Sequence, residues 1–216
     1  GVKPFAAKLS NRYEVWKHRV VADAVHKEGG LIAMQILHAG RYAYSPLAVS
    51  ASPTKSPISP FKPRKLSDKG VEGTIADYVN CAQRPQQAGY DGVEVMGSEG
   101  YLINQFIVAR TNKRTDRWGG DYANRIRFAV EVAQRTVEAI GADRVGIRLS
   151  PHGVFNEMPP YGETLETYVA LTKELKALGL VYLHVVDHSS MGTPPVPQST
   201  KDALREAFGS TLILSG

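Results

Sequence analysis

One short stretch of the chain places an aromatic hydroxyl and a carboxylate directly after an apolar segment. Residues 92–96 read as a buried strand, and Glu99, Gly100 and Tyr101 follow it closely. A phenol, with an ordinary pKa of about 10, can deliver a proton to a developing carbanion. The other interpretation is that the ring of Tyr101 only packs under the loop. The stretch therefore predicts a general acid at Tyr101, with Glu99 in a network that reaches it.

Two further polar side chains lie inside apolar segments, where each must find a partner. Gln35 falls within residues 31–37 and Arg148 within residues 144–149. A buried amide without a hydrogen bond costs about 1–3 kcal/mol, and a buried guanidinium needs an anion or an electron-rich group. A core hydrogen bond for Gln35 and a carboxylate for Arg148 are the structural interpretations. The chemical interpretation is that Gln35 binds the edge of a flat heterocycle and Arg148 an electron-rich ligand group.

Alternating strands and helices must position these residues. The apolar runs that we expect to form strands are residues 31–37, 92–96, 144–149, 180–186 and 211–214. Helical patterns lie between them, and an earlier one has Trp16 and Val20 on its expected apolar face. Ser67 is expected to cap the second helix, in which Pro85 predicts a kink or an early end, because an interior proline loses a backbone hydrogen bond. Residues 42–66 read as a proline- and serine-rich loop at the rim of the site.

This alternation predicts parallel strands joined by helical crossovers. A doubly wound sheet and a (β/α)8 barrel both satisfy the pattern. No glycine-rich phosphate loop follows the first strand, which weakens the doubly wound alternative, and the polar residues follow strand C-termini, as barrel catalysis requires. We therefore predict an α/β fold in which residues 1–216 form one partial (β/α)8 TIM barrel, comprising about strands 3 to 7 of the eight.

The long run from Gly92 to Arg125 resembles the Old Yellow Enzyme family of FMN-dependent ene-reductases. Its segments MGSEGYLINQF and TNKRTDRWGGDYANR are most similar to the 2,4-dienoyl-CoA reductase branch. Residues from Arg144 onward are more similar to the xenobiotic and alkene reductases. Against the family, the chain looks truncated at both ends.

The resemblance implies a role for each residue described above. It places Gln35 on the flavin pyrimidine and Arg148 beside the flavin N1–C2=O edge, and it makes Tyr101 the proton donor. Many members carry a histidine, and a histidine or asparagine three residues later, that hold a substrate carbonyl. This chain has Met96 and Glu99 at those places. The difference argues against the usual enone anchor and favours the dienoyl-CoA reductase pattern.

Other positions follow from the same resemblance. The second group at the site is expected from the loop after residues 180–186, where His188 is the candidate and His184 the fallback. Gly216 stands at the approach to the family's phosphate-binding loops and is the expected phosphate contact. Arg41 reads as a rim or loop-anchoring group, and residues 112–125 as a structural segment.

Composition excludes several classes of protein. The chain has 216 residues, of which 43% are hydrophobic and 22% charged, as in an ordinary soluble globular domain. Its single cysteine, Cys81, excludes an internal disulfide framework and a cysteine-rich metal site, and it favours a reducing, cytoplasmic location. The net charge of +5 is spread along the chain without a recognition motif, so no nucleic-acid partner is expected. No apolar run is long enough to cross a membrane.

The predicted function is that of an FMN-dependent oxidoreductase. It moves a hydride from NADH or NADPH through flavin N5 to an activated alkene, either an enone or an enoyl or dienoyl thioester such as an acyl-CoA, with Tyr101 as the proton donor. A small molecule is the expected partner, and a homo-oligomer is left open. The alternative is a non-catalytic barrel fragment that cannot retain FMN. A flavin-free lyase or aldolase ranks last, because neither a placed lysine nor a metal-ligand cluster is present.

Overall fold

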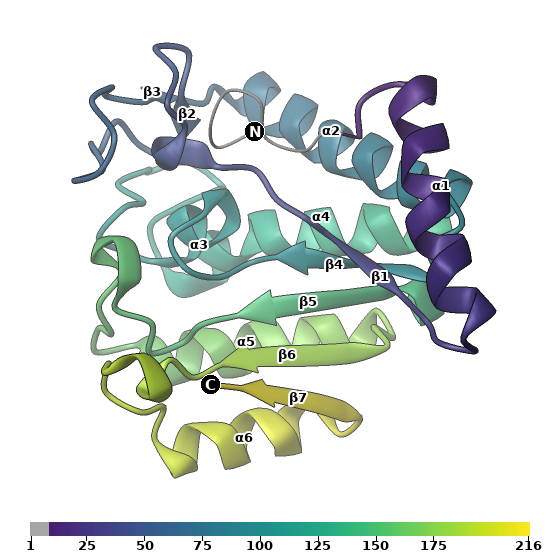
Figure 1. The fold of residues 1–216 in the computed structure, drawn as a ribbon. Helices are drawn as coiled ribbons and strands as arrows, with labels where there is room; N and C mark the ends of the chain where they lie inside the picture. The colour runs from purple at the N-terminus through teal and green to yellow at the C-terminus, as the bar shows by residue number, and fades with distance from the viewer. Residues whose placement is uncertain (1–8) are drawn as a thin grey trace.

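The computed structural model describes residues 9–216 and contains a five-stranded parallel sheet (Figure 1). Its strands, side by side in chain order, are β1 (Ala33–Ile36), β4 (Gly92–Met96), β5 (Val145–Leu149), β6 (Tyr182–Val186) and β7 (Thr211–Ser215). Every neighbouring pair is parallel, which confirms the five expected strands and their order. The first strand is shorter than expected, because its pairing begins with Ala33 opposite Gly92.

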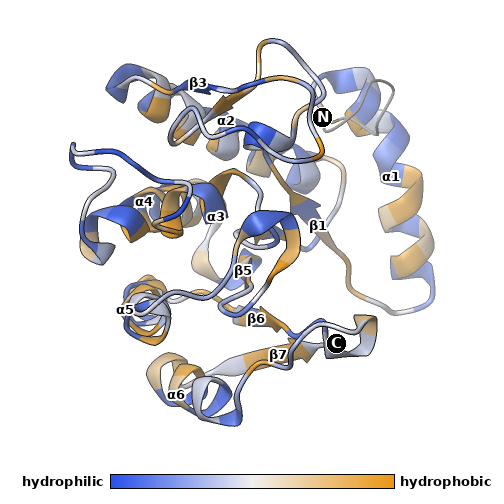
Figure 2. Cartoon of the chain, turned by 90° about the vertical axis from the view of Figure 1, so that its left-hand side faces the viewer, coloured by the Kyte–Doolittle hydropathy of each residue, from blue (hydrophilic) through white to orange (hydrophobic). Residues whose placement is uncertain are grey.

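Long helices connect these strands. They are α1 (Arg12–Lys27), α2 (Asp68–Gln87), α4 (Tyr122–Ile140), α5 (Thr164–Ala177) and α6 (Gln198–Phe208). From α2 onward, successive long helices pack against one another in one layer that follows a single face of the sheet (Figures 1 and 2). A doubly wound sheet carries helices on both faces. The single outer layer therefore belongs to a partial (β/α)8 barrel.

Several short elements lie in segments that the sequence analysis assigned to loops. Helix α3 (Leu102–Ile107) follows β4, and the two-residue strands β2 (Val49–Ser50) and β3 (Arg64–Lys65) pair in parallel across the proline-rich loop. Single 3-10 turns cover Gly40–Tyr42, Ala142–Arg144, Phe155–Glu157 and Ser189–Met191. Elements this short span too few residues to carry a hydrophobic period, so the sequence did not predict them.

The two faces of the sheet differ in chemistry. The helix-facing side chains of Val93, Val95, Ile147 and Leu183 are fully buried. The register places polar residues on the opposite, inner face, namely Gln35, Glu94, Arg148 and His184. Within residues 9–216 no further strand lies across from this inner face, and Gln35 is exposed. The expectation that Gln35 is buried within its strand is therefore wrong.

Helix α1 is rotated away from the expected orientation. Trp16 and Val20 are 67% and 68% exposed, although the sequence places them on the buried face. The helix packs instead through Ala22 and Val15 against Ala88 and its neighbours at the end of α2. Helical spacing identifies an apolar stripe but does not say whether anything covers it, which is why the predicted face was wrong.

Helix α2 begins and ends near the predicted residues. The hydroxyl of Ser67 accepts the N–H of Gly70 at 3.1 Å, which confirms the predicted cap. Pro85 lies inside the last turn and the helix continues to Gln87, so the early end predicted there did not occur. The carbonyl of Pro85 accepts the N–H groups of Ala88 and Tyr90, both at 3.0 Å, which closes the helix around it. In the described part of the chain, no helix is both long and apolar enough to span a membrane.

Candidate active site

Three strand ends meet at the carboxylate of Glu99. Its Oε1 lies 2.6 Å from Nε2 of His188 and 3.3 Å from Nη2 of Arg148. Glu99 follows β4, Arg148 lies in β5 and His188 follows β6, so three adjacent strands bring these residues together. Their side chains are only 10% to 22% exposed. All three residues are site residues expected from the sequence, and the structure joins them through Glu99, with the chemical role of each still a prediction.

The loop that carries Glu99 has a left-handed backbone. The φ angle is +56° at Glu99 and +80° at Gly100, and such a conformation costs a non-glycine residue about 1–3 kcal/mol. The N–H of Glu99 donates to the hydroxyl of Ser150 at 2.9 Å, and the amide of Asn156 donates to the carbonyl of Glu99. A Cβ at Gly100 would overlap the Asn156 side chain. The loop after β5 therefore holds the Glu99 backbone in place.

Arg41 anchors the loop after β5, which contains Asn156 and Glu157. Its side chain is fully buried and donates to the carbonyls of Lys55 at 3.1 Å and Asn156 at 2.5 Å. It also pairs with Glu157 at 3.6 Å. Both Asn156 and Glu157 have positive φ angles, of +65° and +56°. These contacts confirm the loop-anchoring role that the sequence suggested for Arg41.

Tyr101 lies at the start of α3, two residues after Glu99. It is beside the cluster of Glu99, Arg148 and His188, which we call the Glu99 cluster. Its ring packs edge-on against Tyr42, with ring centroids 6.0 Å apart. Burial raises the pKa of Tyr101, the negative charge of Glu99 raises it further, and the positive charge of Arg148 acts in the opposite direction. The phenol therefore keeps its proton at neutral pH, as a proton donor must. The structure contains both a packing contact and an available proton, so catalysis by Tyr101 remains a prediction.

Gln35 and Arg148 lie on the same inner face of the sheet, in agreement with a shared ligand. Gln35 donates from Nε2 to Oε1 of Glu94 at 2.7 Å. His184, the fallback candidate, does not contact Glu99; its Nδ1 lies 2.9 Å from Oε2 of Glu94. Glu94 was missed because a glutamate between valines reads as ordinary alternation. The only sequence signal was its position on the same face as Met96, two residues before the strand end.

Two buried nitrogen atoms at this site have no hydrogen-bond partner among the described residues. They are Nε of Arg148 and Nδ1 of His188. A buried polar atom without a partner is rare in proteins and frequently marks a position where a ligand or water binds. Both atoms belong to the cluster around Glu99, so the cluster has the capacity to bind a further polar group.

Gly216 lies at the end of β7, beside the loop that carries His188. The N–H of Asp187 donates to the carbonyl of Ser215 at 2.6 Å, and a Cβ at Gly216 would overlap the Asp187 backbone. Only glycine fits at this position without a shift of the neighbouring loop. The expected phosphate contact of Gly216 remains a prediction.

The segment 112–125 has the structural character that the sequence predicted. Arg125 is buried and donates to the carbonyls of Ile107 at 2.9 Å and Gly120 at 2.6 Å. Arg114 is also buried and pairs with Asp116 at 2.8 Å. Arg125 and Arg114 thus hydrogen-bond to loop carbonyls and pair with a carboxylate, and they do not form an exposed basic patch.

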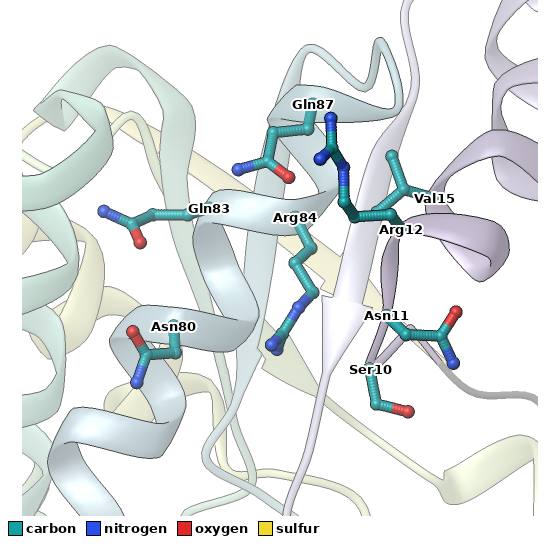
Figure 3. Close-up of a pocket in the computed structure, with 8 residues that line it drawn as sticks. All are labelled: Ser10, Asn11, Arg12, Val15, Asn80, Gln83, Arg84 and Gln87. Carbon is teal, nitrogen blue, oxygen red and sulfur yellow. The ribbon is translucent and has the colours of Figure 1, made fainter.

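A separate polar groove of about 640 Å³ lies between α1 and α2 (Figure 3). Its lining residues are Ser10, Asn11, Arg12, Val15, Asn80, Gln83, Arg84 and Gln87. None of the predicted site residues lines it. The groove adjoins the C-terminal half of α2. Because α2 runs antiparallel to the strands, this half lies near their N-terminal ends (Figure 1). The groove is therefore not the site described above. Among residues 9–216, no three histidine, cysteine or acidic side chains are grouped so that they could hold a metal ion.

Comparison with known proteins identifies the family. The sequence profile of the NADH:flavin oxidoreductase / NADH oxidase family matches residues 3–213. Aldehyde reductase FrzD of Cladobotryum sp is 38% identical over 89% of this chain and 52% of its own length. The 12-oxophytodienoate reductase 2 of Arabidopsis thaliana is 36% identical over 94% of this chain and 58% of its own length.

Solved structures agree with this assignment. Morphinone reductase superposes with a TM-score of 0.91 at 32% identity, covering 96% of this chain and 61% of its own. The old yellow enzyme homologue from Zymomonas mobilis superposes with a TM-score of 0.90 at 28% identity, covering 98% of this chain and 63% of its own. The chain thus spans 52% to 63% of the length of these four proteins. The closer similarity of its front part to 2,4-dienoyl-CoA reductases stays a prediction. The chain belongs to the NADH:flavin oxidoreductase / NADH oxidase family, the Old Yellow Enzyme family that its motifs resemble.

Proposed function

We propose that this chain belongs to an FMN-dependent oxidoreductase that reduces activated alkenes with NADH or NADPH, and that it contributes residues that contact the flavin and the substrate. The observation that carries the proposal is the contact of Oε1 of Glu99 with both His188 and Arg148 at the C-terminal edge of the sheet. Barrel enzymes place their chemistry at this edge. Tyr101 follows Glu99 on the same loop, so a proton donor and a charged cluster lie together.

The residues present fit a flavin. Gln35 and Arg148 lie on one face of the sheet, and Nε of Arg148 is buried without a partner among the described residues. A guanidinium there suits the electron-rich N1–C2=O edge of the ring, and the Gln35 amide suits its pyrimidine edge. FMN, when bound, supplies the hydride that leaves from N5. With FMN bound, Arg148 would place a fixed positive charge beside the ring and would stabilise negative charge on it.

The remaining residues act on the substrate. Tyr101, whose pKa is raised by burial and by Glu99, gives its proton to the carbon beside the electron-withdrawing group. Met96 provides no hydrogen-bonding group for a substrate carbonyl, so we assign the contact with that part of the substrate to His188, whose Nδ1 has no partner among the described residues. Glu99 orients the His188 ring through the 2.6 Å contact. The substrate class that these groups suit is an enone or an enoyl or dienoyl thioester.

The test compares Tyr101→Phe with the unchanged chain after loading with FMN. We expect flavin reduction by the nicotinamide to stay within about threefold, because no proton from Tyr101 is involved in that step. Reoxidation by an alkene should slow by about 10²- to 10⁴-fold, the usual contribution of a general acid. Reoxidation by oxygen needs no protonation of carbon and should be unchanged. Stopped-flow absorbance measures the three rates separately.

Tyr42→Phe is the matched control. It removes a buried hydroxyl, with no partner among residues 9–216, from the ring that packs against Tyr101. Its alkene reoxidation rate should match that of the unchanged chain. An unimpaired rate in Tyr101→Phe would assign the proton to another group. A chain that takes up no FMN at all would favour the non-catalytic alternative.

A further inference from the structure

A ladder of polar side chains crosses the inner face of the sheet below the Glu99 cluster. Nε2 of Gln35 donates to Oε1 of Glu94 at 2.7 Å. Oε2 of Glu94 lies 2.9 Å from Nδ1 of His184, and Nε2 of His184 lies 2.7 Å from the hydroxyl of Ser215. The ladder therefore links β1, β4, β6 and β7.

The ladder crosses β5 because that strand has no side chain at Gly146. A Cβ there would overlap the ring of Tyr182. The ring of Tyr182 fills this gap, and burial, together with the nearby charge of Glu94, raises the pKa of its phenol. Glu94 is thus surrounded by groups from β1 and β6, and its side chain is only 13% exposed.

The chemistry of a carboxylate restricts the orientation of the Gln35 amide. Burial alone would raise the pKa of Glu94, but the hydrogen bonds from His184 and Gln35 outweigh it and the pKa lies below the usual range. Glu94 is therefore ionised at neutral pH and can only accept hydrogen bonds. The NH2 group of Gln35 must face Glu94, so the amide oxygen of Gln35 is the acceptor left for a ligand.

We propose that Glu94 is a positioning residue for Gln35, and that through this contact the site selects a ring presenting an N–H donor to the Gln35 oxygen. The inference rests on the proposed function, because the pyrimidine edge of a flavin carries such a donor at N3. With a neutral amide in place of Glu94, the pair could exchange donor and acceptor. Gln35 could then turn its NH2 toward a ring carbonyl instead.

The ladder could alternatively serve only to fill the inside of the barrel. In that case substitution of Glu94 would weaken the binding of every flavin equally, or change stability alone. A positioning role changes the preference between two ligands that differ only in the N–H group. The ratio of two dissociation constants therefore separates the two roles.

The experiment titrates the full chain with FMN and with 3-methyl-FMN, which lacks the N3 donor, and follows flavin fluorescence. The unchanged chain should bind 3-methyl-FMN about 5- to 100-fold more weakly, as expected when an acceptor that the bound ring covers loses its donor. Glu94→Gln should reduce this ratio to about threefold or less, because the Gln35 amide is no longer held in one orientation. Asp91→Asn is the matched control: it neutralises the 3.0 Å His26–Asp91 pair at the other end of β4 without contacting Gln35. It should keep the full ratio.

A second measurement does not depend on flavin. In ¹⁵N NMR spectra of the free chain, the side-chain amide of Gln35 should move to the position of a solvated glutamine in Glu94→Ala, and should not move in Asp91→Asn. Circular dichroism checks that each variant is folded, and Glu94→Gln, which keeps the shape, replaces Glu94→Ala if the latter unfolds. An unchanged Gln35 signal, or an undiminished flavin ratio in Glu94→Gln, overturns the positioning role. Failure of the unchanged chain to bind either flavin overturns the proposed function instead, and the NMR comparison then decides the positioning role by itself.

Discussion

Glu99→Gln tests the junction of the three strand ends most directly. Oε1 of Glu99 accepts from His188 at 2.6 Å and from Arg148 at 3.3 Å, between side chains that are at most 22% exposed. Glutamine keeps the shape and an accepting oxygen but removes the charge. A hydrogen bond to a charged group contributes about 1.5–3 kcal/mol, roughly twice a neutral one. Two such bonds, each weakened by half, lower the free energy of unfolding by about 1.5–3 kcal/mol.

Urea unfolding at pH 7, followed by circular dichroism, measures this loss in the free energy of unfolding. In a thermal scan, the melting temperature of a chain of this length should fall by about 2–4 °C per kcal/mol, or about 3–12 °C in total. Glu157→Gln is the control, because Glu157 is 39% exposed and its pairs with Arg41 and Arg110 are longer, at 3.6 and 3.5 Å. It should cost at most about 1 kcal/mol. If both variants lose equally little, Glu99 does not form the observed junction in solution.

The same substitution changes the acid at the site. Burial raises the pKa of Tyr101, the charge of Glu99 raises it further, and the charge of Arg148 lowers it. Removing the negative charge leaves the positive one unopposed, so the pKa of Tyr101 should fall in Glu99→Gln. ¹³C NMR of labelled tyrosine, titrated upward from pH 7, gives this pKa directly. A rise, or no change, would show that Glu99 does not act on Tyr101.

Three further predictions concern stability. Pro85→Ala should raise the melting temperature in a thermal scan, because the last turn of α2 regains a backbone hydrogen bond worth about 1 kcal/mol; a loss would mean that packing requires proline. Gly146→Ala should cost about 1–3 kcal/mol in urea unfolding, because its methyl group would overlap the ring of Tyr182, and a neutral effect would refute the ladder geometry. Burial alone would raise the pKa of Asp187, but its hydrogen bond from Lys201, 2.7 Å away, and others lower it from 3.8 to about 2. The contribution of ionised Asp187 to the free energy of unfolding is therefore complete above pH 3.8, and it is lost as the pH falls through about 2. Lys201→Met should accordingly be less stable than the unchanged chain above about pH 5, with a difference that shrinks toward pH 2; a constant difference would exclude the pair as its source.

The fold was predictable where the sequence carries long, uniform signals. The strands near residues 92–96 and 145–149 are short apolar runs between amphipathic helices, and such alternation admits few topologies. Helix α3 and the β2–β3 pair were not predicted because their six and two residues per element carry no period. The orientation of α1 was wrong for a different reason. Trp16 and Val20 form an apolar stripe, but only the packing of Ala22 decides which side of the helix faces the rest of the protein.

The sequence named several candidate site residues one by one, but it did not predict the contacts that link them. Glu99, Tyr101 and Arg148 were identified from their types and from the motifs around them. The link from Gln35 to Glu94 depends on register, since the two residues become direct neighbours only when β1 pairs with β4. The link from Glu94 to His184 depends on the absence of a side chain at Gly146 on the strand between them. A single sequence gives neither register nor the space left by a glycine on another strand.

Arg41 illustrates why the chemistry and the conformation of this site come from different parts of the chain. Glu99 and Asn156 each have a positive φ angle, which neither residue would prefer without outside support. The amide of Asn156 donates to the carbonyl of Glu99, and the carbonyl of Asn156 accepts from the buried guanidinium of Arg41. Loss of Arg41 would therefore release both backbone segments together, although Arg41 contacts neither His188 nor Tyr101 directly in any hydrogen bond or ion pair of the described chain. The strand ends supply the side chains that meet at Glu99, and a buried arginine from another part of the chain holds the backbone in the conformation in which they meet.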